Sequence, residues 1–185
     1  MFEILGAGAL AGFCAKVVDD IIDRRLRVPS YLPILLALAY GLLLGWLSGP
    51  AGLSSLFIAL ALASLLSGKI DHPYHLLGAA AFALVILLTP LGGFSPWWFA
   101  LFLTSGLLDE LELGRGKLLE RLNEERVWTP LAALLGTAFF GLPLLFLLVL
   151  LLFDLSFRFG GWVVSLEYPA HAPQTAPAKP KRKRK

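Results

Sequence analysis

Long uncharged runs of apolar residues constrain this chain more than any other feature. The hydrocarbon core of a bilayer is about 30 Å thick, so a helix that crosses it needs roughly 20 residues. Six runs approach that length: 2–18, 31–48, 53–68, 74–91, 95–108 and 128–153. The segment Gly141-Leu142-Pro143 predicts a kink in the last run, because proline removes a helical hydrogen bond. We therefore expect an all-α, polytopic integral membrane bundle with about six transmembrane helices, with five or seven as alternatives.

The composition agrees with this fold class. Hydrophobic residues make up 57% of the 185 residues and charged residues 16%, whereas water-soluble domains average about 45–50% and about 25%. The single cysteine, Cys14, excludes a disulfide framework and a cysteine-based zinc site. The composition thus argues against an ordinary water-soluble enzyme.

Lysine and arginine are unevenly distributed among the predicted loops. They occur in 19–30, 68–73 and 109–127, and they are absent from 49–52 and 92–94. Because positively charged loops stay in the cytoplasm, we expect a multi-pass cell-membrane protein with cytoplasmic charged loops and its N-terminus outside. Six crossings would leave the C-terminus outside as well, and an extra re-entrant passage through 157–166 would return it to the cytoplasm.

The chain divides into a predicted transmembrane domain, 1–166, and a tail, 167–185. Six of the sixteen basic residues lie in the last seven positions, so the rest of the chain is net acidic. The proline-rich tail has too little apolar surface to fold and is predicted to be disordered. We expect it to contact anionic lipid headgroups or other polyanions, with no specific nucleic-acid recognition. The segment 109–127 is predicted to be an amphipathic cytoplasmic connector.

Two GxxxG patterns lie within predicted spans, at Gly8–Gly12 and Gly41–Gly45. Small residues at this spacing allow the backbones of two helices to approach closely in lipid. The spacing favours packing within the chain, and a homo-oligomer interface is the alternative.

Acidic residues gather in three clusters, each at the predicted cytoplasmic end of an odd-numbered span. If those helices pack together, the clusters converge on one site. The clusters are Asp19, Asp20 and Asp23; Asp71 beside His72 and His75; and Asp109, Glu110 and Glu112.

The first cluster has a spacing that suits phosphate chemistry. In a continuous helix, one face would carry Lys16, Asp19, Asp20, Asp23 and Arg27. Carboxylates are ligands for Mg²⁺, which can bridge to a diphosphate, and nearby cations can bind phosphate oxygens. The alternative is a solvated helix end whose acids are neutralised by its own arginines.

The segment Asp19-Asp20-Ile21-Ile22-Asp23 resembles the DDxxD motif of isoprenyl diphosphate synthases and, more loosely, the acidic motifs of UbiA-type membrane prenyltransferases. The resemblance implies that Asp19, Asp20 and Asp23 bind magnesium and a substrate diphosphate. It covers five residues, so it suggests a shared chemical device and not family membership.

The second cluster precedes a predicted helix that starts at Pro73. Such a helix would direct Asp71, His72 and His75 toward one ion or proton path. The alternative is that the residues before Pro73 cap the helix, since proline favours its first position. Farther along the chain, Asp154 and Arg158 are four residues apart and are expected to pair with each other.

Two functional hypotheses follow. The first is a Mg²⁺-dependent membrane enzyme, a transferase or phosphohydrolase, that acts at the cytoplasmic interface on a lipid or isoprenoid phosphate or diphosphate. It assigns metal binding to Asp19, Asp20, Asp23 and Asp71, phosphate binding to Lys16, Arg24, Arg25 and Lys69, and catalysis to His72, His75 and Asp109. The second is a non-catalytic transporter, channel or scaffold subunit. The spans carry no charge near their middle, which counts against an ion or proton carrier.

Overall fold

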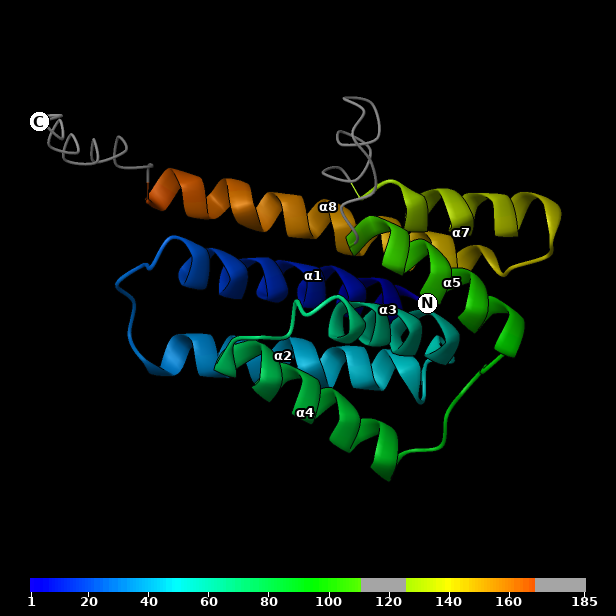
Figure 1. The fold of residues 1–185 in the computed structure, drawn as a ribbon, viewed down its shortest axis with the longest axis horizontal. Coiled ribbons are helices and arrows are strands. Elements are labelled where there is room, and N and C mark those ends of the chain that lie inside the picture. Colours follow the sequence, from blue (N-terminus) through cyan, green and yellow to red (C-terminus); the bar gives the residue numbers. More distant parts are fainter. Residues whose placement is uncertain (111–125, 169–185) are drawn as a thin grey trace, which may run out of the picture.

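The computed structural model describes residues 1–110 and 126–168, which are helical and contain no β-strand (Figure 1). The all-α prediction is confirmed for this part of the chain. Most of the predicted connector, 109–127, and of the predicted tail, 167–185, lies outside the described residues. The helices are α1 (Phe2–Asp23), α2 (Tyr31–Ser48), α3 (Ser54–Leu66), α4 (Pro73–Leu88), α5 (Pro96–Glu110), α7 (Trp128–Phe139) and α8 (Leu144–Glu167).

The first five apolar runs each form one helix, and α2 has the predicted bounds. The prediction of a single kinked helix over 128–153 is wrong, because two helices occupy this run. Gly141 adopts φ +73°, a conformation open to glycine at little cost, and the chain reverses between α7 and α8. Helix α8 then continues to Glu167, so the region 157–166 belongs to a long helix and not to a separate re-entrant passage.

Successive helices run in alternating directions, as Figure 1 shows. The C-terminal ends of α1, α3, α5 and α8 therefore point the same way as the N-terminal ends of α2, α4 and α7. We call this side of the bundle the charged end, because the segments 24–30 and 67–72 there contain Arg24, Arg25, Arg27, Lys69 and Asp71. The segments at the opposite end, 49–53, 89–95 and 140–143, contain no charged residue.

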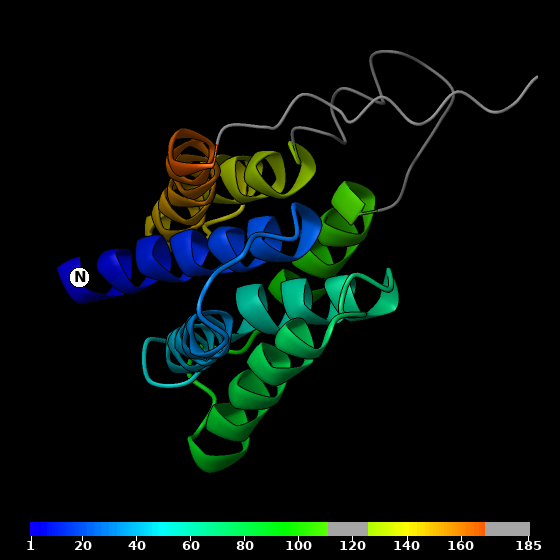
Figure 2. The same ribbon diagram turned by 90° about the vertical axis from the view of Figure 1, so that its left-hand side faces the viewer.

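Both GxxxG patterns pack within the chain. A Cβ added at Gly8 would lie 2.8 Å from a methyl group of Val149 in α8, and one added at Gly12 would collide with the carbonyl group of Phe153. In the same way, Gly41 meets the backbone of Gly78 in α4. The glycines thus bring two pairs of parallel helices together, α1 with α8 and α2 with α4, which Figure 2 shows from the charged end.

Many large apolar side chains lie on the outside of the bundle. Exposed fractions reach 82% for Leu87, 84% for Trp97 and 74% for Phe139. Among the described helices, α2 and α8 are long and apolar enough to cross a membrane, and only 33% and 28% of their apolar windows are buried. The helices α3, α4 and α7 are apolar but shorter. The two long helices are compatible with membrane association.

Candidate functional site

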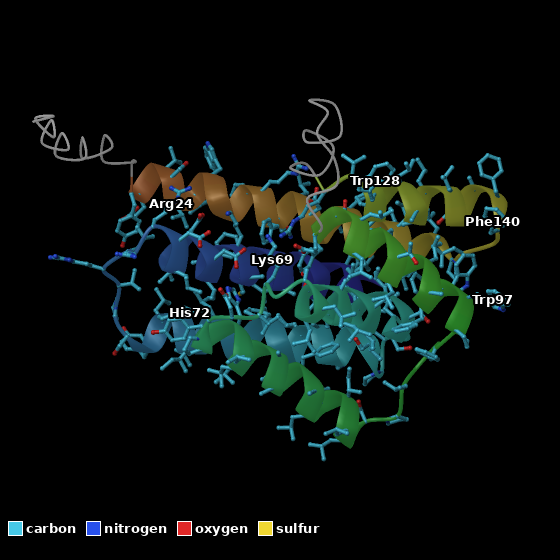
Figure 3. All side chains as sticks on the ribbon, in the orientation of Figure 1. Arg24, Lys69, His72, Trp97, Trp128 and Phe140 are labelled. Atoms are coloured by element: carbon cyan, nitrogen blue, oxygen red, sulfur yellow. The ribbon has the colours of Figure 1, made fainter. Side chains whose placement is uncertain are left out.

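A cavity of about 630 Å³ lies among the helices at the charged end of the bundle. The three short helices α3, α5 and α7 have 13, 15 and 12 residues, whereas α1 and α8 have 22 and 24. The cavity lies where α1, α3 and α5 end and α7 begins, whereas α8 continues past it. In Figure 3, the labelled Lys69 and His72 lie at this site, while Trp97 and Phe140 lie at the opposite end.

The three acidic clusters meet at this cavity. We call the acids that line it the acidic rim, and they are Asp19, Asp23, Asp71, Asp109, Glu110 and Asp154. From the sequence, convergence depended on whether these helices pack together, and the structure brings residues from all three clusters to one cavity. Glu112, the last member of the third cluster, lies outside the described residues.

The deeper part of the cavity is apolar. We call its large apolar residues the apolar floor, and they are Leu44, Phe57, Leu60, Phe82, Leu150 and Phe153. Two of the aromatic rings, those of Phe57 and Phe153, have centroids 6.5 Å apart. The cavity is thus amphipathic, with ionisable groups at the rim and aromatic and aliphatic groups below them.

His75 connects two other polar residues of the cavity. Its Nε2 lies 3.4 Å from the Oδ1 atom of Asp19, and its Nδ1 lies 3.4 Å from the hydroxyl oxygen of Tyr40. The side chains of His75 and Asp19 are only 20% and 29% exposed. A carboxylate beside one nitrogen and a hydroxyl beside the other orient the imidazole ring.

Asp20 departs from the predicted arrangement. It is 3% exposed, it does not line the cavity, and its Oδ1 lies 3.2 Å from both Lys16 Nζ and Arg24 Nε. Its Oδ2 has no hydrogen-bond partner among the described residues and lies near Gly161 of α8. The prediction that Lys16, Asp19, Asp20, Asp23 and Arg27 share one helix face is therefore wrong, since α1 ends at Asp23 and Asp20 faces α8. Of the three aspartates in the DDxxD segment, only Asp19 and Asp23 line the cavity.

Asp109 stabilises the start of α7. Its two carboxylate oxygens accept hydrogen bonds of 2.8 Å from the backbone N–H groups of Trp128 and Thr129. A carboxylate at this position satisfies unpaired N–H groups and interacts favourably with the helix dipole. The structure therefore gives Asp109 a positioning role between α5 and α7.

The predicted phosphate-binding cations are only partly at the cavity. Lys69 lines it, whereas Lys16 and Arg24 pair with Asp20 and Arg25 is exposed in the turn after α1 with φ 50°. Arg126, which sequence reasoning left in the connector, also lines the cavity. Its Nη2 lies 3.5 Å from Glu110 Oε1, and its guanidinium lies 5.5 Å from the centroid of the Phe157 ring.

The second cluster caps α4 and also lines the cavity. His72 caps α4, since its Nδ1 accepts a 3.4 Å hydrogen bond from the backbone N–H of Tyr74. His72, His75 and Asp71 all line the cavity. Within residues 1–110 and 126–168, however, no three histidine, cysteine or acidic side chains are grouped closely enough to hold a metal ion by themselves.

Sequence reasoning did not assign Tyr40, Arg126 or Asp154 to the site, and all three line the cavity. Asp154 was expected to pair with Arg158, and that pair is confirmed at 3.0 Å. Its place in the cavity was not expected, because Asp154 follows an apolar run whose C-terminal end was predicted to lie away from the other acids. Since the chain reverses between α7 and α8, the C-terminal end of α8 lies at the charged end of the bundle instead.

Comparisons of the chain with family models, curated proteins and solved structures find no match. The resemblance to prenyl-diphosphate enzymes stays confined to five residues. The function of this helical protein is therefore argued from the chemistry of its cavity.

Proposed function

We propose that this protein is a multi-pass membrane enzyme that acts on a lipid or isoprenoid carrying a phosphate or diphosphate, with a divalent cation such as Mg²⁺. One observation carries the proposal: residues from three separate acidic clusters, with His75 among them, line a single cavity that also has an apolar floor. An amphiphile with a polar head and a hydrocarbon body matches both parts of that lining.

Exposed apolar surface supports the membrane part of the proposal. A helix that is apolar all round is normally buried, either in a protein core or in lipid. Helices α2 and α8 leave most of their apolar windows unburied by protein, and exposed leucines and phenylalanines cover the neighbouring helices. A bilayer would cover these side chains.

The proposed orientation places the charged end of the bundle in the cytoplasm. The positively charged loops support this side, and the reversal between α7 and α8 brings Glu167 back to it. The basic tail would then start on the cytoplasmic side, where each Lys or Arg near anionic headgroups contributes about 1 kcal/mol to membrane binding. In this topology the basic tail starts on the cytoplasmic side, whereas six crossings would have left it outside.

Labelling of single cysteines tests this topology. The chain has one cysteine, so Cys14→Ser gives a cysteine-free background. We expect a membrane-impermeant maleimide to label Pro50→Cys and Phe140→Cys in intact cells, and to label Lys69→Cys and Tyr168→Cys only after the membrane is opened. All four positions are exposed at helix ends. Labelling of Tyr168→Cys in intact cells would contradict the reversal.

In the proposed mechanism, Asp19 and Asp23 would hold the cation, which would offset the negative charge of the substrate phosphate. Mg²⁺ in enzymes is commonly bound by one or two carboxylates plus substrate phosphates, not by an all-protein cage. Lys69 and Arg126 bind further phosphate oxygens, since lysine and arginine form charge-assisted hydrogen bonds to phosphate. Asp19 holds Nε2 of His75, and Nδ1 exchanges its contact with the hydroxyl of Tyr40 for one with the reacting oxygen, to or from which it transfers a proton.

Charge balance makes the cation necessary in this proposal. Six carboxylates line the cavity, against only Lys69 and Arg126 among the permanently cationic side chains of the described lining. A phosphate would be repelled by such a lining unless a divalent cation entered with it. Asp109, Glu110 and Asp154 are already engaged, by α7, by Arg126 and by Arg158, which leaves Asp19, Asp23 and Asp71 to interact with the cation.

The direct test uses the full chain in lipid nanodiscs with polyprenyl phosphates and diphosphates as probes. We expect calorimetric binding and release or transfer of phosphate that require Mg²⁺ and that are lost in the Asp19→Asn/Asp23→Asn double variant. Glu3→Gln, at the other end of α1, is the matched control and should behave as wild type. Wild-type protein that binds neither Mg²⁺ nor these lipids would exclude the enzyme proposal and favour the non-catalytic alternative.

A further inference from the structure

The apolar floor has no role in the proposed chemistry, which takes place at the acidic rim. Its side chains come from α2, α3, α4 and α8. The residues Leu44, Leu60 and Phe82 are only partly buried although they pack against the hydrophobic core. Apolar surface that faces a cavity of this size is typical of a ligand site.

The part of the cavity wall between α3 and α4 has little packing of one helix against the other. Helix α4 packs along α2, and α3 packs along α5, but these two described helices make no extended contact with each other. Both nevertheless line the cavity, α3 through Ala61 and Ser64 and α4 through Ala79 and Phe82. Three of these four side chains are small, and we call the part of the lining that they form the slot.

Outward-facing leucines lie on both of these helices. Leu65 and Leu66 of α3 are 56% and 63% exposed, and Leu76 and Leu84 of α4 are 52% and 54% exposed. In the proposed membrane setting these side chains face lipid. A hydrocarbon chain that passed between the two helices at the slot would reach the apolar floor from the acyl-chain region of the bilayer.

We infer that a single hydrocarbon chain of the substrate enters from the bilayer between α3 and α4 and lies on the apolar floor, which places its headgroup at the acidic rim. The inference rests on the proposed function for the nature of the headgroup, and it adds a subsite for the chain. Because the slot is lined by Ala61, Ser64 and Ala79, it selects lipids with one slender chain over lipids with two chains.

Photolabelling tests the chain subsite separately from catalysis. Two diazirine-bearing probes are used with the full chain in nanodiscs: a long-chain alkyl phosphate and the matching neutral alcohol. Labelled peptides are then mapped by mass spectrometry. We expect both probes to label α3 and α4 around the apolar floor, and we expect Mg²⁺ to increase labelling by the phosphate probe alone.

Alanines of the slot provide matched variants. Ala79 lines the cavity, whereas Ala80 is exposed on the outside of the same helix. Ala79→Leu should lower labelling of the floor by about tenfold, because added methyl groups fill the slot, and Ala80→Leu should leave it unchanged. Ala61→Leu repeats the test on α3, with Ala61→Ser as its control, because serine keeps this side of the slot small.

Equal labelling in Ala79→Leu and Ala80→Leu, with Ala61→Leu matching Ala61→Ser, would overturn the inference. So would labelling spread as heavily over the exposed leucines of α7, Leu131, Leu134 and Leu135, as over the slot. Failure of the proposed function has a different signature. In that case the neutral alcohol still labels the floor in a manner sensitive to Ala79→Leu, while Mg²⁺ has no effect on the phosphate probe.

Discussion

His75→Gln is expected to reduce turnover of the lipid phosphate substrate by about 10²- to 10⁴-fold, the range typical of a lost general acid or base. Glutamine has a similar reach but cannot carry a proton between a substrate oxygen and solvent. The expectation depends on the position of the imidazole, 3.4 Å from both Asp19 and the hydroxyl of Tyr40. The measurement is the initial rate of phosphate release or transfer in nanodiscs at saturating Mg²⁺.

His72→Gln is the matched control for this prediction. His72 lies three residues earlier at the same cavity, but it caps α4 through its Nδ1. We expect its replacement to change turnover by less than about tenfold and to cost about 1 kcal/mol of stability, the usual effect of a lost cap. Loss of activity in His72→Gln with full activity in His75→Gln would contradict the assignment and give the role of proton transfer to His72.

Gly12→Ala is expected to destabilise the protein by about 1–3 kcal/mol, the usual cost of overpacking a well-packed site. The added methyl group would collide with the carbonyl group of Phe153, and backbone atoms cannot rotate away as a flexible side chain can. Helices α1 and α8 would have to separate, and the ion pair between Lys16 and Asp20 lies in the same contact region. The free energy of unfolding, measured by titration with a denaturing detergent, checks the effect.

Gly6→Ala provides the control on the same helix. A Cβ at Gly6 meets no atom within 4 Å, so the substitution should be stabilising by about 0.5–1 kcal/mol because alanine is the better helix former. The two variants add the same atoms, and only the contact differs. Equal effects of the two variants on stability would show that the close contact between α1 and α8 does not contribute to stability.

The helices of this protein were predictable because apolar runs of sufficient length form helices wherever backbone groups cannot bond to water. Every described helix except α8 starts or ends near a boundary of a run, and α2 coincides with one. The error at 128–153 arose at Gly141, where a left-handed residue turns the chain back. Hydropathy alone cannot distinguish a kink from a reversal, since both keep the run apolar.

The candidate site was predictable in its acids and less so in its other residues. Four of the acids could be found because charged residues are few in this chain and these acids lie at or near the ends of apolar runs: Asp19, Asp23, Asp71 and Asp109. Tyr40 and Arg126 could not be found, because nothing in the sequence distinguishes a tyrosine within an apolar run or an arginine at the end of a connector as part of a site. Asp20 was assigned to the metal site, but α8 covers its side of α1, and this packing has no local signal in the sequence. Its pair with Arg24 matches the alternative of a helix end whose acids are neutralised by its own arginines.

The sequence by itself determined the helical class, the positions of the helices and the concentration of charge at one end of the bundle, since these depend on hydropathy and on nearest neighbours along the chain. Tertiary structure decided which acids share a cavity, which side of α1 is covered by α8, and how α8 returns to the charged end. These features depend on contacts between helices that are far apart in the chain. The close approach at Gly12 and Gly41 sets those contacts, because it selects the helix pairs that pack together.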